Sequence, residues 1–230
     1  MATERQKQQF EKGLRDYRKK YLTKKQNLEL DESATRIMVN YFLTDVLGYT
    51  ELDDIKTEYA IKGGYADYVI QLARKKHFVV EVKSIQIDLN PHHLRQSRGY
   101  AADEGIDWIL LFNGKQIQLY RVIFGKPIDV HKIFEFDLAD LSTIRTAANH
   151  LINLSKNSVA KDELETYWKR FDALTPSNLI KQLYTADVIN CIRKKVRASS
   201  GINFDNDDVL NALHDLIVDS HETTKPKNLK

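Results

Sequence analysis

The chain has 230 residues, of which 42% are hydrophobic and 29% are charged, and its formal net charge at pH 7 is +3. This composition excludes global disorder and is typical of a chain that folds around a sizeable core. No apolar run reaches the ~18 residues that a bilayer span needs, and the charged N-terminus lacks the apolar segment of a signal peptide, so we expect a cytoplasmic protein with no membrane partner.

The N-terminal part of the chain predicts two helices. Residues 1–29 form a polar segment in which Leu14 and Tyr17 recur with other apolar residues at helical spacing. A clearer amphipathic helix is expected from about Leu30, and Gly48 stands where a C-terminal cap is favoured.

A predicted strand at 57–64 is followed by a predicted hairpin. Residues 65–72 and 77–84 are short segments rich in β-branched and aromatic side chains, and the polar run 74–76 joins them. Two such segments with a polar turn between them are typical of an antiparallel strand pair.

The register of this hairpin decides which side chains meet. Side chains alternate along a strand, so Glu81 and Lys83 share one face. If Leu72 pairs with Lys76, Asp67 lies directly opposite Glu81, and opposite residues have Cβ atoms about 4.5–5.5 Å apart. A slip of one residue without a bulge would turn Asp67 to the wrong face.

Two facing carboxylates are suited to holding Mg²⁺, a cation that prefers hard oxygen ligands. Asp67 and Glu81 are the candidate ligands, with the backbone carbonyl of Val82 as a third and Mn²⁺ as a substitute metal. If such a site hydrolyses a phosphodiester, Lys83 would contact the attacking water or the scissile phosphate and stabilise the charge that develops during the reaction. The alternative is a solvated charge pattern, which is the commoner reason for an acid and a lysine two residues apart on a strand.

Downstream of the hairpin the pattern predicts a helix and three more strands. Pro91 precedes a helix over 92–104, whose adjacent histidines we interpret as a solvated helix start. The strands are expected at 108–112, 116–123 and 132–138.

Residues 139–220 are predicted to be helical, and 221–230 to form a polar tail. The expected helices cover 141–154, 161–174, 177–198 and 205–218. The single cysteine, Cys191, excludes an intrachain disulfide and agrees with a reducing compartment. Its apolar neighbours predict that it is buried.

The segments Gly64–Ile70 and Val79–Ser84 resemble the PD-(D/E)XK nuclease superfamily, and more narrowly the N-terminal nuclease domain of type I restriction enzyme R subunits. Three further segments agree with this resemblance. Glu32–Arg36 is similar to the start of the family's opening helix, Gln96–Tyr100 to its Gln-x-x-x-Tyr element, and Trp108–Gly114 to its closing strand pair. The resemblance covers about residues 30–138, and Ala66 stands where the superfamily is named for proline.

The resemblance implies an α/β fold, with a restriction-endonuclease-like core in which helices flank a central mixed sheet, plus the helical C-terminal region. It implies that Asp67 and Glu81 bind metal, that Lys83 is the catalytic lysine, and that Glu32 is an accessory acid. It also implies that Gln96 and Tyr100 position nucleic acid or brace the site. For each accessory residue an ordinary role is the alternative: a helix salt bridge between Glu32 and Arg36, a surface position for Gln96, and a core position for Tyr100.

The predicted activity is that of a Mg²⁺-dependent endonuclease that hydrolyses phosphodiester bonds of DNA, for example in defence against foreign DNA. Arg36, Lys75 and Lys76 are further candidates for contacts with nucleic acid. The chain has no Gly-x-x-x-x-Gly-Lys-Ser/Thr loop, so movement along DNA would need a separate motor or recognition subunit. A homodimer through the C-terminal helices is expected, and a nucleic-acid-binding or scaffold protein without turnover is the alternative function.

Overall fold

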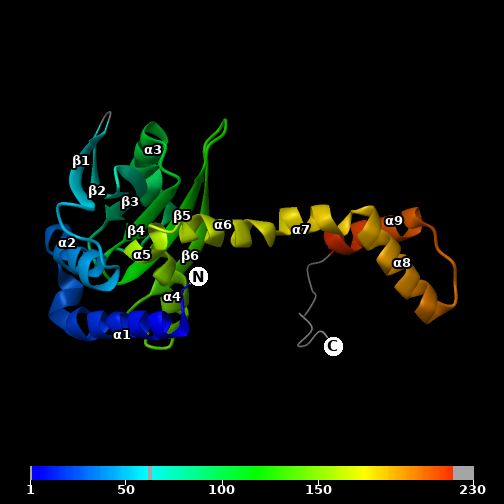
Figure 1. Ribbon diagram of the computed structural model, residues 1–230, viewed down its shortest axis with the longest axis horizontal. Coiled ribbons are helices and arrows are strands. Elements are labelled where there is room, and N and C mark those ends of the chain that lie inside the picture. The colour runs from blue at the N-terminus through cyan, green and yellow to red at the C-terminus, as the bar shows by residue number, and fades with distance from the viewer. Residues whose placement is uncertain (1, 62–63, 220–230) are drawn as a thin grey trace. The chain divides into compact units, whose positions relative to one another are not determined.

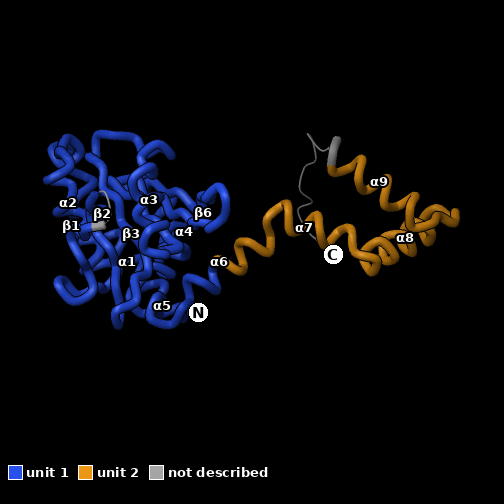
Figure 2. The backbone as a smooth tube through the Cα atoms, turned by 90° about the horizontal axis from the view of Figure 1, so that it is seen from above, with its two compact units in different colours: residues 1–167 blue, residues 168–230 orange. Residues whose placement is uncertain are grey.

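The structure is a computed structural model that describes residues 2–61 and 64–219 (Figure 1). The chain divides into two compact units, residues 1–167 and 168–230 (Figure 2). The segment expected to be nuclease-like, 30–138, lies within the first unit, which also includes the helices before and directly after it. The expected polar tail, 221–230, lies outside the described residues.

The first unit is built on a six-stranded sheet whose strands are arranged in the order of the sequence. The strands are β1 (Ile55–Ile61), β2 (Gly64–Leu72), β3 (Lys75–Val82), β4 (Trp108–Phe112), β5 (Gln116–Ile123) and β6 (Asp129–Asp137). Only β3 and β4 pair in parallel, and helix α3 (Leu94–Glu104) connects them, preceded by the 3₁₀ turn η3 (Pro91–His93). The predicted α/β fold with a mixed sheet is confirmed.

Helices cover both faces of this sheet. On one face α3 packs over an apolar cluster that includes Val79, Ile109 and Leu111. Side chains alternate along a strand, so Phe112 projects from the other face. There its ring centroid lies 4.8 Å from that of Phe42 and 6.4 Å from that of Tyr17. Glu81 shares the α3 face with Val79, as the alternation predicts.

The N-terminal helices pack on the face of the sheet opposite α3. Helix α1 (Glu4–Tyr21) is shorter than predicted, because its C-cap is Leu22 and a separate 3₁₀ turn, η1 (Lys25–Glu29), follows. The Tyr17 hydroxyl donates a 2.6 Å hydrogen bond to the Gly114 carbonyl in the β4–β5 turn. Helix α2 (Glu32–Tyr41) begins at the N-cap Asp31 and continues into a π-helical turn, η2 (Phe42–Val46).

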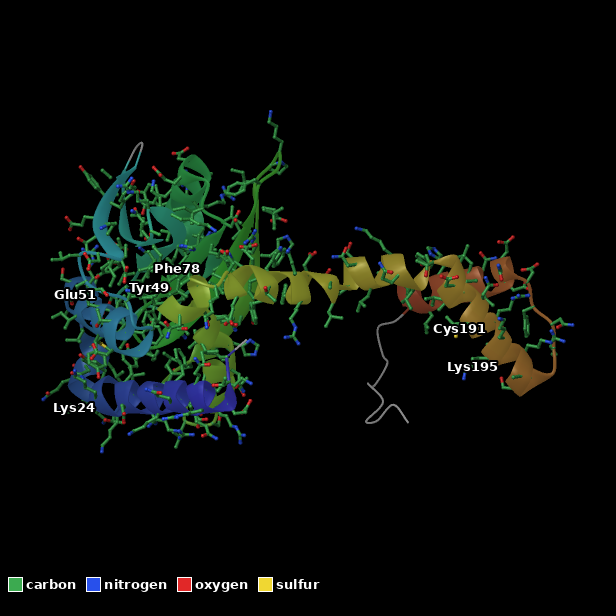
Figure 3. All side chains as sticks on the ribbon, in the orientation of Figure 1. Lys24, Tyr49, Glu51, Phe78, Cys191 and Lys195 are labelled. Atoms are coloured by element: carbon green, nitrogen blue, oxygen red, sulfur yellow. The ribbon has the colours of Figure 1, made fainter. Side chains whose placement is uncertain are left out.

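The segment that follows η2 anchors the sheet from the same side. The rings of Tyr49 and Phe78, both labelled in Figure 3, pack edge to face with centroids 5.9 Å apart. The Tyr49 hydroxyl donates a 2.6 Å hydrogen bond to the Leu154 carbonyl. This contact joins the strand layer to the helices that follow the sheet.

The β2–β3 hairpin differs from the prediction at its turn and agrees with it at its open end. Leu72 pairs with Lys75 rather than with Lys76, so the turn contains only Ala73 and Arg74. A bulge between Ile70 and Gln71 then shifts the register by one residue. Beyond the bulge Tyr68 faces Val80, which is the predicted register.

The helices after the sheet are more numerous than expected, and all but α9 are shorter. They are α4 (Ile144–Leu151), η4 (Ile152–Leu154), α5 (Lys156–Val159), α6 (Glu163–Ala173), α7 (Pro176–Leu183), α8 (Ala186–Ser200) and α9 (Asn206–Asp219). The α4 helix packs beside α1 (Figure 1). The single helix predicted over 177–198 is divided by the extended residue Thr185, the N-cap of α8.

The second unit buries few side chains. On α8 only Ile189 is buried, and Cys191 is exposed, so its predicted burial is wrong. The reason is that α8 packs against few helices within its unit, and these cover only a narrow stripe of its surface. The homodimer expected through these helices stays a prediction. Among the described residues no helix is both long and apolar enough to span a membrane.

The β2–β3 turn yields a stability prediction. Ala73 and Arg74 have φ angles of 47° and 69°. Left-handed backbone costs an ordinary residue about 1–2 kcal/mol, and a two-residue turn with two positive φ angles favours Asn-Gly. We expect Ala73→Asn combined with Arg74→Gly to raise the free energy of unfolding by about 1 kcal/mol in urea denaturation. Arg74→Lys should leave it unchanged, and a loss in the double variant would contradict this turn geometry.

Candidate active site

The two acids lie where β2 and β3 separate. The strand ladder ends at the pair Tyr68 and Val80, one residue before Asp67 and Glu81. The Val82 N–H donates instead to the Asp67 side chain, with 2.8 Å between the nitrogen and Oδ2. The register that ends there places Asp67 and Glu81 opposite each other across the opening.

The Glu81 carboxylate is buried and doubly hydrogen-bonded. Its side chain is only 5% exposed. Lys83 Nζ lies 2.5 Å from Oε1, and the hydroxyl of Ser97, a buried residue of α3, donates to Oε2 at 2.7 Å. A carboxylate is costly to bury unless it is paired and hydrogen-bonded, so both partners are needed to keep Glu81 in this position.

Arg36 of α2 binds the other acid. Its guanidinium pairs with Asp67 and lies 3.7 Å from a Glu32 carboxylate oxygen and 3.8 Å from one of Glu58. The predicted i,i+4 ion pair between Glu32 and Arg36 is therefore present, and Glu32 connects to Asp67 through Arg36. In the part of the chain that the structure describes, Arg36 Nε is buried without a hydrogen-bond partner.

The donor set fits a divalent cation. The four carboxylates and the two cationic side chains described above carry a formal charge of −2, which one divalent cation would balance. N–H and C=O of one residue point to the same edge of an extended strand. The Val82 amide faces Asp67, so the Val82 carbonyl faces the same side. Asp67, Glu81 and that carbonyl are hard oxygen ligands of the kind that Mg²⁺ takes.

The set is sparse in side-chain ligands. Among the described residues no group of three or more His, Cys, Asp or Glu side chains is arranged to hold a metal ion. Two carboxylates are nevertheless a usual number for Mg²⁺, which keeps several of its waters.

Tyr100 and Gln96 of α3 take different positions. Tyr100 is 8% exposed and its hydroxyl lies against the start of β2, where a Cβ on Gly64 would be 2.1 Å from that oxygen. Gly64 is thus required for this close approach, three residues before Asp67. Gln96 is exposed and lines a hollow together with Lys83.

His93 lines the same hollow. Its Nδ1 accepts the Asn90 N–H at 3.3 Å, which leaves Nε2 to carry the proton of the neutral ring. Burial and the adjacent Lys83 lower the pKa of His93, so the ring is neutral at pH 7. The two adjacent histidines lie at a helical start, as expected, and His92 is exposed, but His93 is half-buried beside the site.

Lys75 and Lys76 lie at the opposite end of the hairpin. Lys76 precedes Glu81 by five residues on β3, which separates their Cα atoms by about 17 Å at ~3.3 Å per residue. Lys75 Nζ lies 3.1 Å from an Asp162 oxygen, and Lys76 pairs with Glu104. The structure therefore does not bring these two lysines together with the acids.

Three residues of the site were not predicted from the sequence. Ser97 leaves a usable signal, since it is a polar residue in phase with Leu94 and Ala101 on the buried side of α3. Glu58 leaves none, because it reaches Arg36 from a strand position with a positive φ of 44°. His93 is visible in the sequence, but its cap to Asn90 depends on the local turn.

Comparison of the chain with protein-family models, with curated proteins and with solved structures finds no match.

The Ser97 hydrogen bond yields a second prediction. Ser97→Ala removes a donor from a buried carboxylate, and a lost hydrogen bond to a charged group costs about 1–3 kcal/mol. We expect that decrease in the free energy of unfolding by urea denaturation. Ser142→Ala is the matched control, because its hydroxyl also bonds a carboxylate but at an exposed position. An equal effect in both variants would contradict the importance of the Glu81 contact.

Proposed function

We propose that the chain is a metal-dependent endonuclease that hydrolyses phosphodiester bonds of DNA. The observation that carries the proposal is the opening at the end of the β2–β3 ladder. There Asp67 and Glu81 face each other and Lys83 contacts Glu81. Two carboxylates and a lysine at one strand end are suited to holding a divalent cation beside a phosphate.

The topology supports a restriction-endonuclease-like core. Three antiparallel strands, β1 to β3, are followed by the crossover helix α3 and by β4, which is parallel to β3. A helix precedes this set, and the acids lie on the second and third strands. These features agree with the resemblance to the PD-(D/E)XK nucleases found in the sequence, which remains part of the proposal.

Each side chain has a separate role in the proposed reaction. Asp67, Glu81 and the Val82 carbonyl would hold Mg²⁺, with Mn²⁺ as a substitute. The metal would neutralise charge on the phosphate and lower the pKa of a bound water. Lys83 Nζ, held by Glu81, orients the attacking water or stabilises charge on the phosphate.

Arg36 has a second task in this scheme. Its guanidinium holds the Asp67 carboxylate while its buried Nε–H has no partner among the described residues. That nitrogen is closed to solvent, but the side chain as a whole is 35% exposed, so a phosphate oxygen would bind the exposed edge of the guanidinium. Arg36 is therefore proposed to bind the substrate phosphate next to Asp67.

A nucleic-acid-binding or scaffold protein without turnover is the second candidate. It is favoured by one observation: both oxygens of Asp67 and both oxygens of Glu81 already accept hydrogen bonds. Such a network can serve structure alone. The two candidates differ in whether the purified protein cuts DNA when metal is supplied. With either function, a separate chain would supply movement along DNA or sequence recognition.

Cleavage tests the proposal directly. Purified protein is incubated with supercoiled plasmid and with single-stranded DNA in Mg²⁺ or Mn²⁺. We expect cutting by the wild type and a loss of at least about 100-fold in Glu81→Gln and Lys83→Gln, as is typical when a group that stabilises transition-state charge is removed. Lys161→Gln, an exposed lysine, is the control. Equal residual cutting in all four proteins would sink the endonuclease proposal and favour the scaffold.

Metal binding can be measured without turnover. A ligand at 100 times its Kd stabilises the folded state by about 2.7 kcal/mol. We expect Mn²⁺ or Mg²⁺ to raise the Tm of the wild type and not that of Asp67→Asn or Glu81→Gln. The exposed Glu51 supplies the control Glu51→Gln, which should respond like the wild type (Figure 3). The same rise in every variant would mean that metal binds elsewhere.

A further inference from the structure

Two adjoining hollows flank α3, and neither is lined by Asp67 or Glu81. The first has a volume of about 590 Å³ and is lined by Lys83, Gln96 and Gly99, among others. The second has a volume of about 630 Å³ and is lined by Arg98 and by Lys132 of β6. Both share His92 and Arg95 in their walls, so they form one surface that begins at Lys83.

Two arginines on this surface have guanidinium groups that are unpaired among the described residues. Arg95 and Arg98 are exposed, and neither guanidinium has an ion-pair partner in the described ranges 2–61 and 64–219. Two acids also line the hollows: Asp129, whose carboxylate contacts His131 at 3.0 Å, and the exposed Asp103, one turn beyond Gly99. Positions i and i+3 of a helix are neighbours, so the two arginines present adjacent cationic groups.

Gly99 gives an independent observation. It lies inside α3, where glycine is a poorer helix former than any residue except proline. Its backbone is helical, and a Cβ built on it would meet no atom within 4 Å. The fold itself therefore gives no reason for glycine here, in contrast to Gly64. A residue without a side chain leaves the helix surface open to close approach from outside.

We propose that the sugar–phosphate backbone of the substrate crosses α3 at Gly99. Arg95 and Arg98 contact neighbouring phosphates of one strand, and the strand continues to the scissile phosphate at Lys83. Arginine suits this task because its planar guanidinium binds phosphate in a bidentate manner. The inference rests on the proposed function and identifies the path of its substrate.

Binding is measured apart from cutting, in EDTA, by fluorescence anisotropy of labelled single-stranded and duplex DNA over a series of salt concentrations. Each lost phosphate contact lowers the slope of log K against log salt by about 0.9 for duplex and about 0.7 for single strands. We expect the double variant Arg95→Gln, Arg98→Gln to bind roughly tenfold more weakly, with a slope smaller by about 1.4–1.8. The variant Arg5→Gln, Lys12→Gln removes the same charge from exposed positions of α1 and should bind like the wild type.

Gly99→Ala separates a substrate path from a structural role. We expect it to raise the urea midpoint, because alanine favours the helix, and to weaken DNA binding roughly tenfold, because the added methyl group blocks close approach. A raised midpoint with unchanged binding would overturn the crossing at Gly99. Unchanged affinity and slope in the double arginine variant would overturn the contacts with Arg95 and Arg98.

The outcomes also distinguish the two proposals. If the wild type binds DNA through the arginines and does not cut it in Mg²⁺ or Mn²⁺, the path stands and the endonuclease fails. If the wild type cuts DNA and the arginine variants bind and cut equally well, the endonuclease stands and the path fails. Absence of both binding and cutting by the wild type would overturn both.

Discussion

The hydrogen bond from the Val82 amide to the Asp67 carboxylate takes the place of a ladder hydrogen bond where β2 and β3 separate. The Asp67 carboxylate can therefore lie between the two strands at the end of the sheet, and the Val82 N–H still has a hydrogen-bond acceptor. The same opening brings Glu81 into a buried position, where Lys83 and Ser97 must support it. The proposed chemistry depends on this exchange of a backbone partner for a side chain.

The surrounding elements hold the opening from two sides. Helix α3 supplies Ser97 from one face of the sheet, and α2 supplies Arg36 to Asp67. Both helices are fixed by apolar packing that is remote from the acids, such as the ring contact between Phe42 and Phe112. The charged groups are thus positioned by apolar packing outside the site, which keeps the helices in place when a cation or a phosphate binds.

Periodicity was sufficient for the order of the strands, for their bounds to within about three residues, and for the facing of Asp67 and Glu81. It was insufficient at the hairpin turn. There Leu72 pairs with Lys75, one residue earlier than predicted, and the bulge after Ile70 moves the pairing back by one residue. Only the sum of these two shifts affects which residues face each other, so the predicted register is confirmed beyond the bulge although the predicted turn was wrong.

Contacts between distant elements were beyond the reach of the sequence. The link from Arg36 to Glu58 joins a helix to a strand with an unusual backbone angle, and no local pattern encodes it. The exposure of Cys191 has a similar cause, because helical spacing shows an apolar stripe and not how much of that stripe a partner covers. Ser97 could have been found by asking why a polar residue lies in phase with the buried side of α3.

The most direct test of the central claim is a crystal structure of the protein with Mn²⁺, with the metal located by anomalous diffraction. The account predicts one peak at the end of the β2–β3 ladder, at about 2.0–2.2 Å from an oxygen of Asp67, an oxygen of Glu81 and the Val82 carbonyl, close to the distances typical of Mg²⁺ sites. Absence of a peak there at saturating Mn²⁺, with Arg36 and Lys83 still bound to the two acids, would contradict it.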